Sequence, residues 1–402
     1  MDIIVRKYGG TSVSTKESRD LIAKDAIELK RSGKYPVIVV SAIGRSGDPY
    51  ATDTLISKLT DVDKGVSTRE LDMIMSCGEI ISAAVMAATI AAKGEKAIAL
   101  TGFQAGIITD NIFSDANVIE VDTKKIITHL KNDEIVVVTG FQGISKSGDI
   151  TTLGRGGSDN TAAILGSALN ADSIEIYTDV DGVMTADPRI VADAKVLSNI
   201  SYDEVYQMAI DGAKVVDHKA IEVAKQSGRI LKIKNTFSRA EGTVISSEEL
   251  VDKSNMDKNL ITAVTARTNV SQYTVNIDSK DDKNEKLLVD MENNGISIDL
   301  INFFDDRKVY TINTNDMDTM NQILKKLKLE YFVIEDCSKI AIIGHRINGI
   351  PGVMRRIVLA LHKEKIEILQ SSDSNTSIWC LVKADDTKDA IKSLHDEFEL
   401  SK

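Results

Sequence analysis

The first 245 residues alternate between short apolar runs and longer stretches in which apolar side chains recur every three or four positions. The apolar runs predict strands at the N-terminus and at residues 37–40, 96–100, 135–139, 173–178 and 230–234. The helical spacing predicts helices at residues 17–32, 54–61, 69–93, 123–132, 160–169, 201–210 and 217–227. This alternation is typical of an α/β domain with an open, mainly parallel sheet sandwiched by helices, and we expect such a domain over residues 1–245.

The pattern changes after residue 245. Residues 246–259 are polar and charged, which predicts a linker. Beyond them, the order strand, helix, strand, strand, helix occurs twice. The predicted elements are strands 272–277, 296–303 and 308–313 with helices 284–294 and 317–328, and then strands 339–347, 366–371 and 377–383 with helices 352–363 and 386–397. We expect two α+β, ferredoxin-like modules, at residues 260–335 and 336–402, and a spare strand at residues 261–266 fits either one.

Composition narrows the class of protein. The 402 residues carry a formal net charge of −11, and 43% of them are hydrophobic, which favours a soluble globular protein. An acidic chain has no basic footprint for nucleic acid or an anionic membrane, so we expect neither partner. The N-terminus lacks a signal-peptide layout, and the apolar stretch at residues 80–92 is too short to span a bilayer. The three cysteines and five histidines show no disulfide or metal-ligand spacing, so we expect a reduced, cytoplasmic protein without a metal site of its own.

The densest chemistry lies in the loop Gly154-Arg155-Gly156-Gly157-Ser158-Asp159. Its glycines let backbone N–H groups approach a ligand, and the start of the next helix adds a positive dipole end, so the loop suits an anion. Arg155 offers a planar fork for a carboxylate or phosphate, and Asp159 suits an ammonium or a metal-bound phosphate. Together they suit a zwitterion. The alternative is a loop in which Ser158 or Asp159 only caps the helix.

Two further charged residues stand beside glycines. Lys7 precedes Gly9 and Gly10 at the end of the first strand, where its ammonium suits a phosphate; alternatively, it is an edge-strand lysine before a turn. Glu79 follows Gly78 inside the long helix, where it either holds an amino group or is buried against a structural arginine.

The sequence contains no Walker A loop, no protein-kinase signature and no GxGxxG dinucleotide fingerprint. The acidic loop at residues 177–189 follows a predicted strand and suits a nucleoside, and it lacks the spacing of an EF-hand calcium loop. If the chain transfers a phosphoryl group, Lys7, the glycine loops and Lys214 supply the positive charge, and magnesium bridges the phosphates.

Several motifs stand in an order that closely resembles the aspartokinases of the amino-acid-kinase superfamily. They are KYGGTSV at residues 7–13, VVSAIG at 39–44, SCGE at 76–79, GRGGSDNTA at 154–162, YTDVDGVMTADPR at 177–189 and GAKVV at 212–216. The C-terminal modules resemble the family's paired ACT modules. The resemblance implies phosphorylation of the L-aspartate side-chain carboxylate with ATP and Mg²⁺, giving 4-phospho-L-aspartate, the entry step to lysine, threonine and methionine. The alternatives are another kinase of the superfamily, a catalytically silent amino-acid sensor and a dehydrogenase with a regulatory tail.

The resemblance also implies roles for individual residues. The implied catalytic residues are Lys7, Asp159 and Lys214. The implied aspartate site is Ser41, Thr52, Glu79, Phe141, Arg155, Ser158 and Asp159. The implied ATP site is Lys7, Tyr8, Gly9, Gly10, Thr178, Asp179, Met184, Arg189, Lys214 and Val215, with Met184 where the family commonly has an aromatic residue. Arg155 would hold the α-carboxylate of aspartate, and Glu79 with Asp159 its α-ammonium. No general base is needed, because the distal carboxylate is already ionised at neutral pH.

ACT modules bind amino-acid effectors where two modules meet. The implied effector residues are Asn348, Gly349, Ile350, Pro351, Gly352, Val353, Gln370 and Ser371, because free N–H groups at such a turn and helix start suit a carboxylate. The counterpart at residues 278–282 lacks the Pro-Gly pair. The segments VVSAIGRSGDPYATD and FELSK most resemble the diaminopimelate-sensitive aspartokinases of Gram-positive bacteria. Three questions stay open: whether diaminopimelate, lysine or threonine is the effector, whether the modules serve only to dimerise, and whether the chain forms a homodimer or a tetramer.

Overall fold

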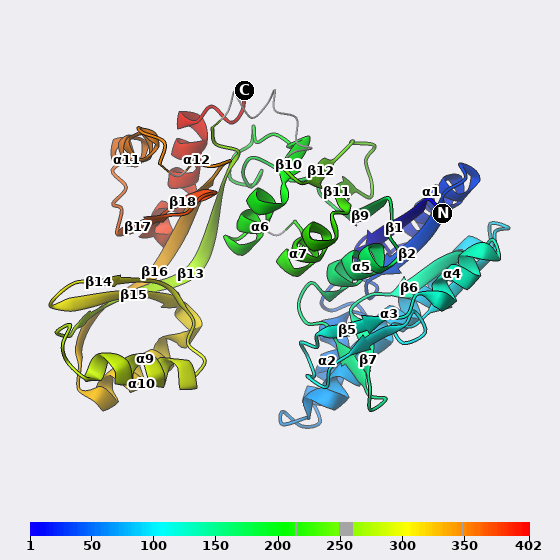
Figure 1. The fold of residues 1–402 in the computed structure, drawn as a ribbon, viewed down its shortest axis with the longest axis horizontal. Coiled ribbons are helices and arrows are strands. Elements are labelled where there is room, and N and C mark those ends of the chain that lie inside the picture. The colour runs from blue at the N-terminus through cyan, green and yellow to red at the C-terminus, as the bar shows by residue number, and fades with distance from the viewer. Residues whose placement is uncertain (214, 249–259, 348) are drawn as a thin grey trace. The chain divides into compact units, whose positions relative to one another are not determined.

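The structure is a computed structural model and describes residues 1–213, 215–248, 260–347 and 349–402. The chain divides into two compact units, and Figure 1 labels most of their elements. Unit 1 contains Met1–Val183, Val196–Ala209 and the described part of residues 214–253. Unit 2 contains Met184–Lys195, Ile210–Ala213 and the described part of residues 254–402. Two short segments of the N-terminal half therefore fold with the C-terminal half.

Unit 1 is built around an eight-stranded sheet. In spatial order its strands are β10 (Asn199–Ser201), β12 (Thr243–Ser246), β11 (Ile230–Asn235), β9 (Ser173–Thr178), β1 (Ile3–Tyr8), β2 (Tyr35–Val40), β6 (Ile135–Thr139) and β3 (Ala97–Leu100). The strands from β11 to β3 are parallel, and the ladder reverses between β11 and β12. The expected open, mainly parallel sheet is confirmed.

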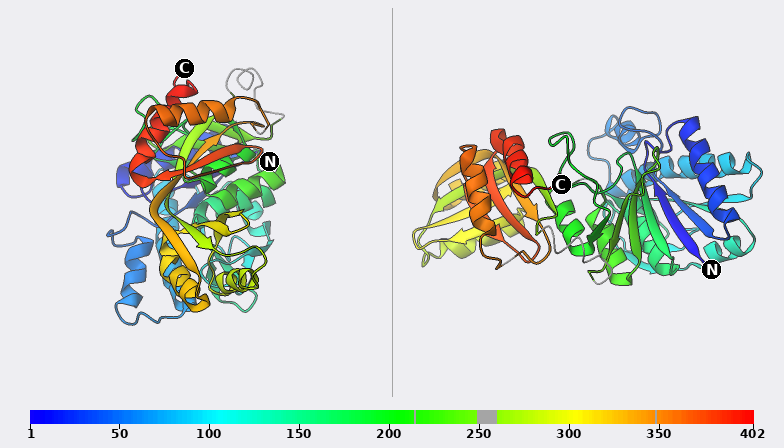
Figure 2. Two further views of the ribbon diagram at one scale, coloured as in Figure 1. Left: turned by 90° about the vertical axis from the view of Figure 1, so that its left-hand side faces the viewer. Right: turned by 90° about the horizontal axis from the view of Figure 1, so that it is seen from above.

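Helices cover both faces of this sheet (Figure 2). The helices of the N-terminal half are α1 (Lys16–Arg31), α2 (Thr52–Thr60), α3 (Thr68–Ala91), α4 (Lys124–Lys131), α5 (Gly157–Ala168), α6 (Tyr202–Ile210) and α7 (His218–Ser227). On one face, Ile22 of α1 and Met86 of α3 share a core with Ile38 of β2. On the other face, Gly166 lets α5 approach Ile174 of β9, because a Cβ there would lie 2.3 Å from that side chain. Double coverage explains why β2 and β6 are apolar at nearly every position.

The α3 helix is an interior element. Its 24 residues are long and apolar enough to cross a membrane by length and composition. The apolar stretch noted at residues 80–92, too short by itself, is therefore largely part of a longer apolar helix. Half of the most apolar part of α3 is nevertheless buried inside the protein. The buried face of the helix carries Asp72 and Glu79. Ionisable side chains are costly inside a bilayer, so Asp72 and Glu79 favour a core helix over a membrane span.

A second, four-stranded sheet in unit 1 is not foreseen from the sequence. Its strands, in spatial order, are β5 (Val118–Val121), β4 (Ile107–Thr109), β7 (Gln142–Ser145) and β8 (Ile150–Thr152). Strands of three or four residues are too short to show a clear apolar alternation. The β7 and β8 strands form a hairpin that carries the chain from β6 to the loop around Arg155.

Unit 2 contains a six-stranded antiparallel sheet and four α-helices among its described residues. In spatial order the strands are β14 (Ile298–Phe303), β15 (Arg307–Asn313), β13 (Ala263–Asn276), β16 (Glu330–Ile343), β18 (Ser377–Lys383) and β17 (Gln370–Asp373). The helices are α9 (Lys283–Asn293), α10 (Met317–Leu327), α11 (Val353–Lys363) and α12 (Thr387–Glu397). The predicted order strand, helix, strand, strand, helix occurs twice.

The two long strands β13 and β16 run through both modules. Residues 270–276 of β13 pair with β15, whereas residues 263–267 pair with the end of β16 that lies next to β18. Register shifts separate the two halves of β13. The spare strand expected at residues 261–266 therefore belongs with the second module.

Two apolar cores support these modules. One contains Tyr273, Leu287 and Leu324, and the other contains Ile342, Leu361 and Leu394. The second core also takes Ala186 and Val191, which is why Met184–Lys195 folds with unit 2.

Candidate active site

The carboxyl ends of four adjacent strands meet at one edge of the eight-stranded sheet. Tyr8, the last residue of β1, pairs with Val40 of β2 and Tyr177 of β9, and β6 continues the row. Hydrogen bonds extend this alignment, from Ser41 N to Tyr8 O at 3.1 Å and from Gly140 N to Val40 O at 2.9 Å. The loops after these strands therefore start side by side, as expected for a ligand site in a parallel sheet.

Two glycines allow these loops to approach closely. A Cβ at Gly10 would lie 2.5 Å from Gly44 O, and the Gly44 N–H donates to Gly10 O at 3.1 Å. A Cβ at Gly140 would lie 2.6 Å from Ser158 Oγ. Both positions need glycine because any side chain would collide with a neighbouring loop.

Lys7 and Asp159 form an ion pair at this edge. Lys7 Nζ lies 2.6 Å from Asp159 Oδ1, and each side chain is 13% exposed. Asp159 lies in the first turn of α5, which begins at Gly157 rather than at the expected residue 160. Gly156, at φ +69°, is the N-cap and no side chain caps the helix, so the interpretation of Ser158 or Asp159 as a cap is wrong.

Asp217 brings a second carboxylate to Asp159. Its backbone N–H donates to Asp159 Oδ2 at 3.4 Å, and its own side chain caps α7 by accepting from Lys219 N at 2.9 Å. Burial, and to a smaller extent the charge of Asp159, raise the pKa of Asp217. In the sequence, Asp217 stands out only as a residue type that caps helices. Asp159 and Asp217 thus bring two carboxylates close to the Lys7 ammonium, and carboxylates favour the binding of a cation that arrives with a ligand.

Glu79 is a buried carboxylate with an unused oxygen. The residue is 2% exposed, and Oε1 accepts the Ala42 N–H at 3.0 Å. Within the described residues, Oε2 has no hydrogen-bond partner and no arginine pairs with the carboxylate, so the alternative of a structural arginine pair is wrong. Burial raises the pKa of Glu79 from 4.5 to about 8. A buried carboxylate with one unpaired oxygen is suited to bind a positively charged group of a ligand.

The other predicted aspartate-site residues also lie in unit 1. Ser158 is buried, and Phe141 adopts the left-handed φ of +71°. Ser41 follows β2, and Thr52 is the first residue of α2. The Arg155 side chain is exposed and, among the residues that the structure describes, forms no hydrogen bond or ion pair. Its guanidinium is therefore available to a ligand.

Part of the predicted nucleotide site stays in unit 1. Thr178 ends β9, and the exposed Asp179 follows it. Asp179 pairs with Arg45 at 2.8 Å, and Arg45 lies in the loop after β2, a cation that the sequence did not single out. Val215 is half-buried in the same unit.

Two of the predicted nucleotide residues lie in unit 2. Met184 and Arg189 belong to unit 2, where Thr185 O accepts from Val264 N at 2.8 Å and Thr185 Oγ1 lies 3.0 Å from His395 Nε2. Lys214 lies outside the described residues. The role of these residues in ATP binding stays a prediction.

The turn before α11 carries most of the predicted effector residues. Gly349 and Gly352 have φ values of +76° and +93°, and Gly352 is the N-cap of α11. Ile350 and Pro351 are exposed, and Asn348 lies outside the described residues. The turn therefore presents accessible backbone at a helix start.

Gln370 on β17 lies in a buried polar network. Its Oε1 accepts from Gln272 Nε2 and Thr311 Oγ1, both at 2.9 Å, and its Nε2 donates to Asn302. Ser371 is exposed. Gln370 thus links β17 to β13, β14 and β15, and this structural use is independent of any effector.

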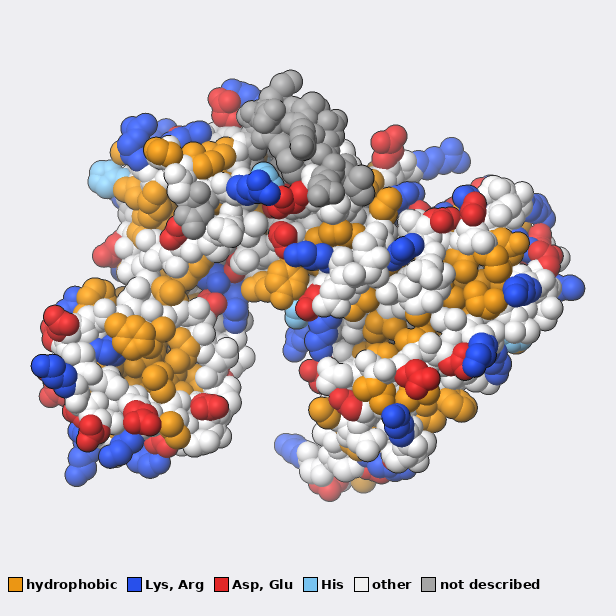
Figure 3. Space-filling model, in the orientation of Figure 1, with side chains coloured by type: hydrophobic (Ala, Val, Ile, Leu, Met, Phe, Trp, Pro, Cys, Tyr) orange, Lys and Arg blue, Asp and Glu red, His pale blue; other side chains and the backbone are white. Residues whose placement is uncertain are grey.

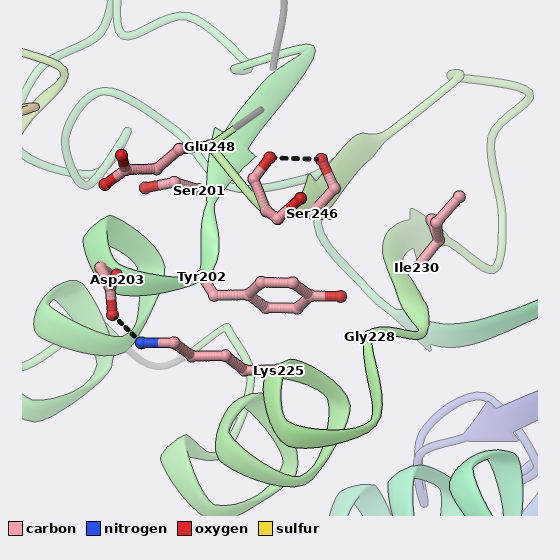
Figure 4. Close-up of a pocket in the computed structure, with 9 residues that line it drawn as sticks. Ser201, Tyr202, Asp203, Lys225, Gly228, Ile230, Ser246 and Glu248 are labelled. Atoms are coloured by element: carbon pink, nitrogen blue, oxygen red, sulfur yellow. Dashed lines mark hydrogen bonds and ion pairs between the residues drawn. The ribbon is translucent and has the colours of Figure 1, made fainter. Parts of the chain in front are cut away.

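A separate hollow of about 260 Å³ lies at the opposite edge of the eight-stranded sheet (Figure 4). Its lining includes Tyr202 and Ile230, and its Asp203 and Lys225 already neutralise each other as an ion pair. Ile230 is the first residue of β11 and pairs with the start of β9. The hollow is therefore at the amino ends of the parallel strands, and we place the active site at the other edge.

Comparisons with known proteins agree with this architecture. The amino acid kinase family matches residues 2–235, and the ACT domain matches residues 332–396. The chain is 42% identical over 404 residues to aspartokinase 1 of Bacillus subtilis (strain 168), covering 100% of both chains. Its fold is similar to that of E. coli aspartokinase III in complex with aspartate and ADP (R-state), with a TM-score of 0.81, 23% identity and coverage of 98% and 99%. For the same enzyme in complex with lysine and aspartate (T-state), the TM-score is 0.75 at 23% identity, with coverage of 99% and 100%.

Proposed function

The chain belongs to the aspartokinases, which makes it an aspartate kinase with ACT regulatory domains, and from this premise we propose which residues perform and control the transfer. The similarity to aspartokinases extends over the full length of the chain, at 42% and 36% identity to two of them. The alternative of a dehydrogenase is therefore dropped. The carboxyl edge of the unit 1 sheet is the proposed site.

The observation that carries the proposal is the unused oxygen of Glu79. Glu79 Oε2 is buried without a hydrogen-bond partner among the described residues, as an α-ammonium pocket requires. Asp159 gives the same ammonium a second carboxylate. Arg155, exposed and unpaired within the described residues, takes the α-carboxylate with its planar fork. The distal carboxylate of aspartate is then left free and ionised as the nucleophile.

Lys7 serves the phosphate side of the site. Without ligand its ammonium is neutralised by Asp159 at 2.6 Å. In the proposed complex, Asp159 turns to the substrate ammonium and Lys7 to the transferring phosphoryl group, next to the backbone of Gly9 and Gly10. A loose phosphoryl-transfer transition state spreads negative charge over its oxygens, and a fixed ammonium stabilises that charge. Lys214 is the proposed second lysine.

Mg²⁺ fits this site as a companion of ATP. Among the described residues, no three His, Cys, Asp or Glu side chains are grouped to hold a metal ion. Mg²⁺ in kinase sites is commonly bound by one or two carboxylates together with substrate phosphates and water. Asp217, whose backbone N–H donates to Asp159, is the neighbouring carboxylate that suits this role, because Asp159 is assigned to the substrate ammonium. When bound, the ion neutralises phosphate charge.

Unit 2 is the proposed site of control. We assign the effector carboxylate to the N–H groups of the turn 349–353 before α11 and expect a cytoplasmic enzyme of the diaminopimelate-sensitive type, on the motif resemblance. Lysine stays a candidate effector because E. coli aspartokinase III is described in complex with lysine. A homo-oligomer through unit 2 is supported by Phe303, Phe304 and Phe332, which are exposed. Figure 3 shows hydrophobic side chains gathered over the module with β14 and β15.

Steady-state kinetics of ADP release test these assignments. With a panel of amino acids as acceptors, L-aspartate should be the preferred substrate. Arg155→Ala should raise the KM for aspartate far more than the KM for ATP, and equal rises would remove Arg155 from the aspartate site. Adding diaminopimelate, lysine and threonine singly to the same assay identifies the effector.

A further inference from the structure

Asp72 is a fully buried carboxylate on α3 that no sequence motif singles out. Its Oδ2 accepts the backbone N–H groups of Ser114 at 2.9 Å and Thr152 at 2.8 Å. Its Oδ1 accepts the Thr152 hydroxyl at 2.8 Å and the Ser114 hydroxyl at 3.4 Å. One carboxylate thus joins α3 to the loop at Ser114 and to the end of β8, which are distant in sequence.

Both segments support the backbone next to Arg155. Thr152 ends β8, and its carbonyl accepts from Ala116 N at 2.9 Å, so the strand and the loop after Ser114 are held together. Gly154, at φ +72°, lies against that loop, because a Cβ there would lie 2.2 Å from Asp115 Oδ1. The backbone entering Arg155 is therefore fixed, although the Arg155 side chain is exposed.

The same helix carries Glu79, about two turns beyond Asp72, and both residues lie on its buried face. We propose that Asp72 is a positioning residue for aspartate binding, which sets the spacing between Arg155 and Glu79 by fixing Ser114 and Thr152 to α3. The inference rests on the proposed roles of Arg155 and Glu79. The α-carboxylate and α-ammonium of aspartate are attached to one carbon atom, so they need a fixed spacing between their partners. A displacement of about 1 Å is enough to cost up to about 100-fold in rate.

A pair of neighbouring threonines gives a matched test. Thr152→Val removes one donor to Asp72, whereas Thr151→Val removes an equally buried hydroxyl that instead bonds Thr109 Oγ1 at 2.6 Å. We expect Thr152→Val to raise the KM for aspartate about 10-fold and Asp72→Asn about 10- to 100-fold, with the KM for ATP within about twofold. Thr151→Val should leave both constants unchanged. Equal effects of the two threonine variants, or parallel rises in both KM values, would overturn the inference.

Arg155→Ala, alone and combined with Thr152→Val, separates this inference from the proposed function. We expect the double variant to show a KM for aspartate within about twofold of Arg155→Ala alone, because a displaced arginine and a missing one lose the same contact. Independent, multiplicative effects would show that Asp72 does not act through Arg155 and would overturn the inference alone. An unchanged KM for aspartate in Arg155→Ala itself would overturn the proposed aspartate site as well. Thr152→Val keeps the test valid if Asp72→Asn does not fold.

Discussion

Replacing Glu79 with Gln should weaken aspartate binding and yet stabilise the protein at alkaline pH. Burial raises the pKa of Glu79 from 4.5 to about 8. Between these two pH values, the Glu79 side chain is protonated in the folded protein and ionised in the unfolded chain. Stability falls with pH wherever the folded state binds more protons than the unfolded state. At 1.36 kcal/mol per pH unit, the ionised Glu79 costs about 5 kcal/mol above pH 8.

Glutamine removes this charge but leaves a buried amide N–H₂ where Oε2 had no partner, which costs about 1–3 kcal/mol. The net gain of Glu79→Gln is therefore about 2–4 kcal/mol near pH 9 and close to zero or negative near pH 5. Urea unfolding at several pH values measures the difference. Glu70→Gln is the control, because Glu70 lies on the same helix with a half-exposed side chain. A gain that does not change between these pH values would refute the reasoning.

The same substitution should harm catalysis. Removing one partner of a buried ion pair costs about 3–5 kcal/mol, so the KM for aspartate should rise by roughly 10²-fold to a few times 10³-fold in Glu79→Gln. In the unsubstituted enzyme, aspartate binding should strengthen by up to about tenfold per pH unit as pH rises toward 8, because the ionised carboxylate binds the ammonium. That part of the pH dependence should be absent from Glu79→Gln.

Three further substitutions test other parts of the account. Lys7→Met should lower kcat about 10²- to 10³-fold in the ADP-release assay, with a smaller loss in Lys7→Arg, because the charge on the transferring phosphoryl group loses its ammonium. Lys339→Met should destabilise unit 2 by about 3–5 kcal/mol in urea unfolding. The reason is that the Lys339 ammonium pairs with the buried Asp211 at 2.9 Å and with Asp299 at 3.1 Å. Adding Asp211→Asn should recover part of the lost stability. Gly352→Ala should weaken effector inhibition and leave kcat without effector unchanged, because its φ of +93° is strained for alanine.

The candidate site at the carboxyl edge of the sheet can be predicted from the sequence because the residues that mark it do so locally. Continuous apolar runs mark buried parallel strands, and the glycines after β1 and β6 mark loops in close contact. Lys7 and Asp159 were both candidates, and their contact at 2.6 Å follows from strand order, which the sequence does not state. The early start of α5 was missed because Gly157 and Ser158 have weak helix propensity and tertiary contacts override it.

Features that depend on distant partners were not foreseeable. Met184–Lys195 reads as part of a nucleotide loop, but Ala186 and Val191 complete a core made of residues from the C-terminal module. β13 reads as two strands because Asn269, at φ +62°, interrupts its apolar pattern where the register shifts. No sequence signal marks Asp72, since its four donors belong to Ser114 and Thr152, which are far along the chain.

The most direct test of the central claim is a crystal structure with L-aspartate and a non-hydrolysable ATP analogue. We expect the α-ammonium of aspartate at hydrogen-bond distance from Glu79 Oε2, the α-carboxylate on Arg155, and the terminal phosphate on Lys7. Ligands bound in the hollow lined by Tyr202, or an aspartate whose ammonium does not contact Glu79, would contradict the account.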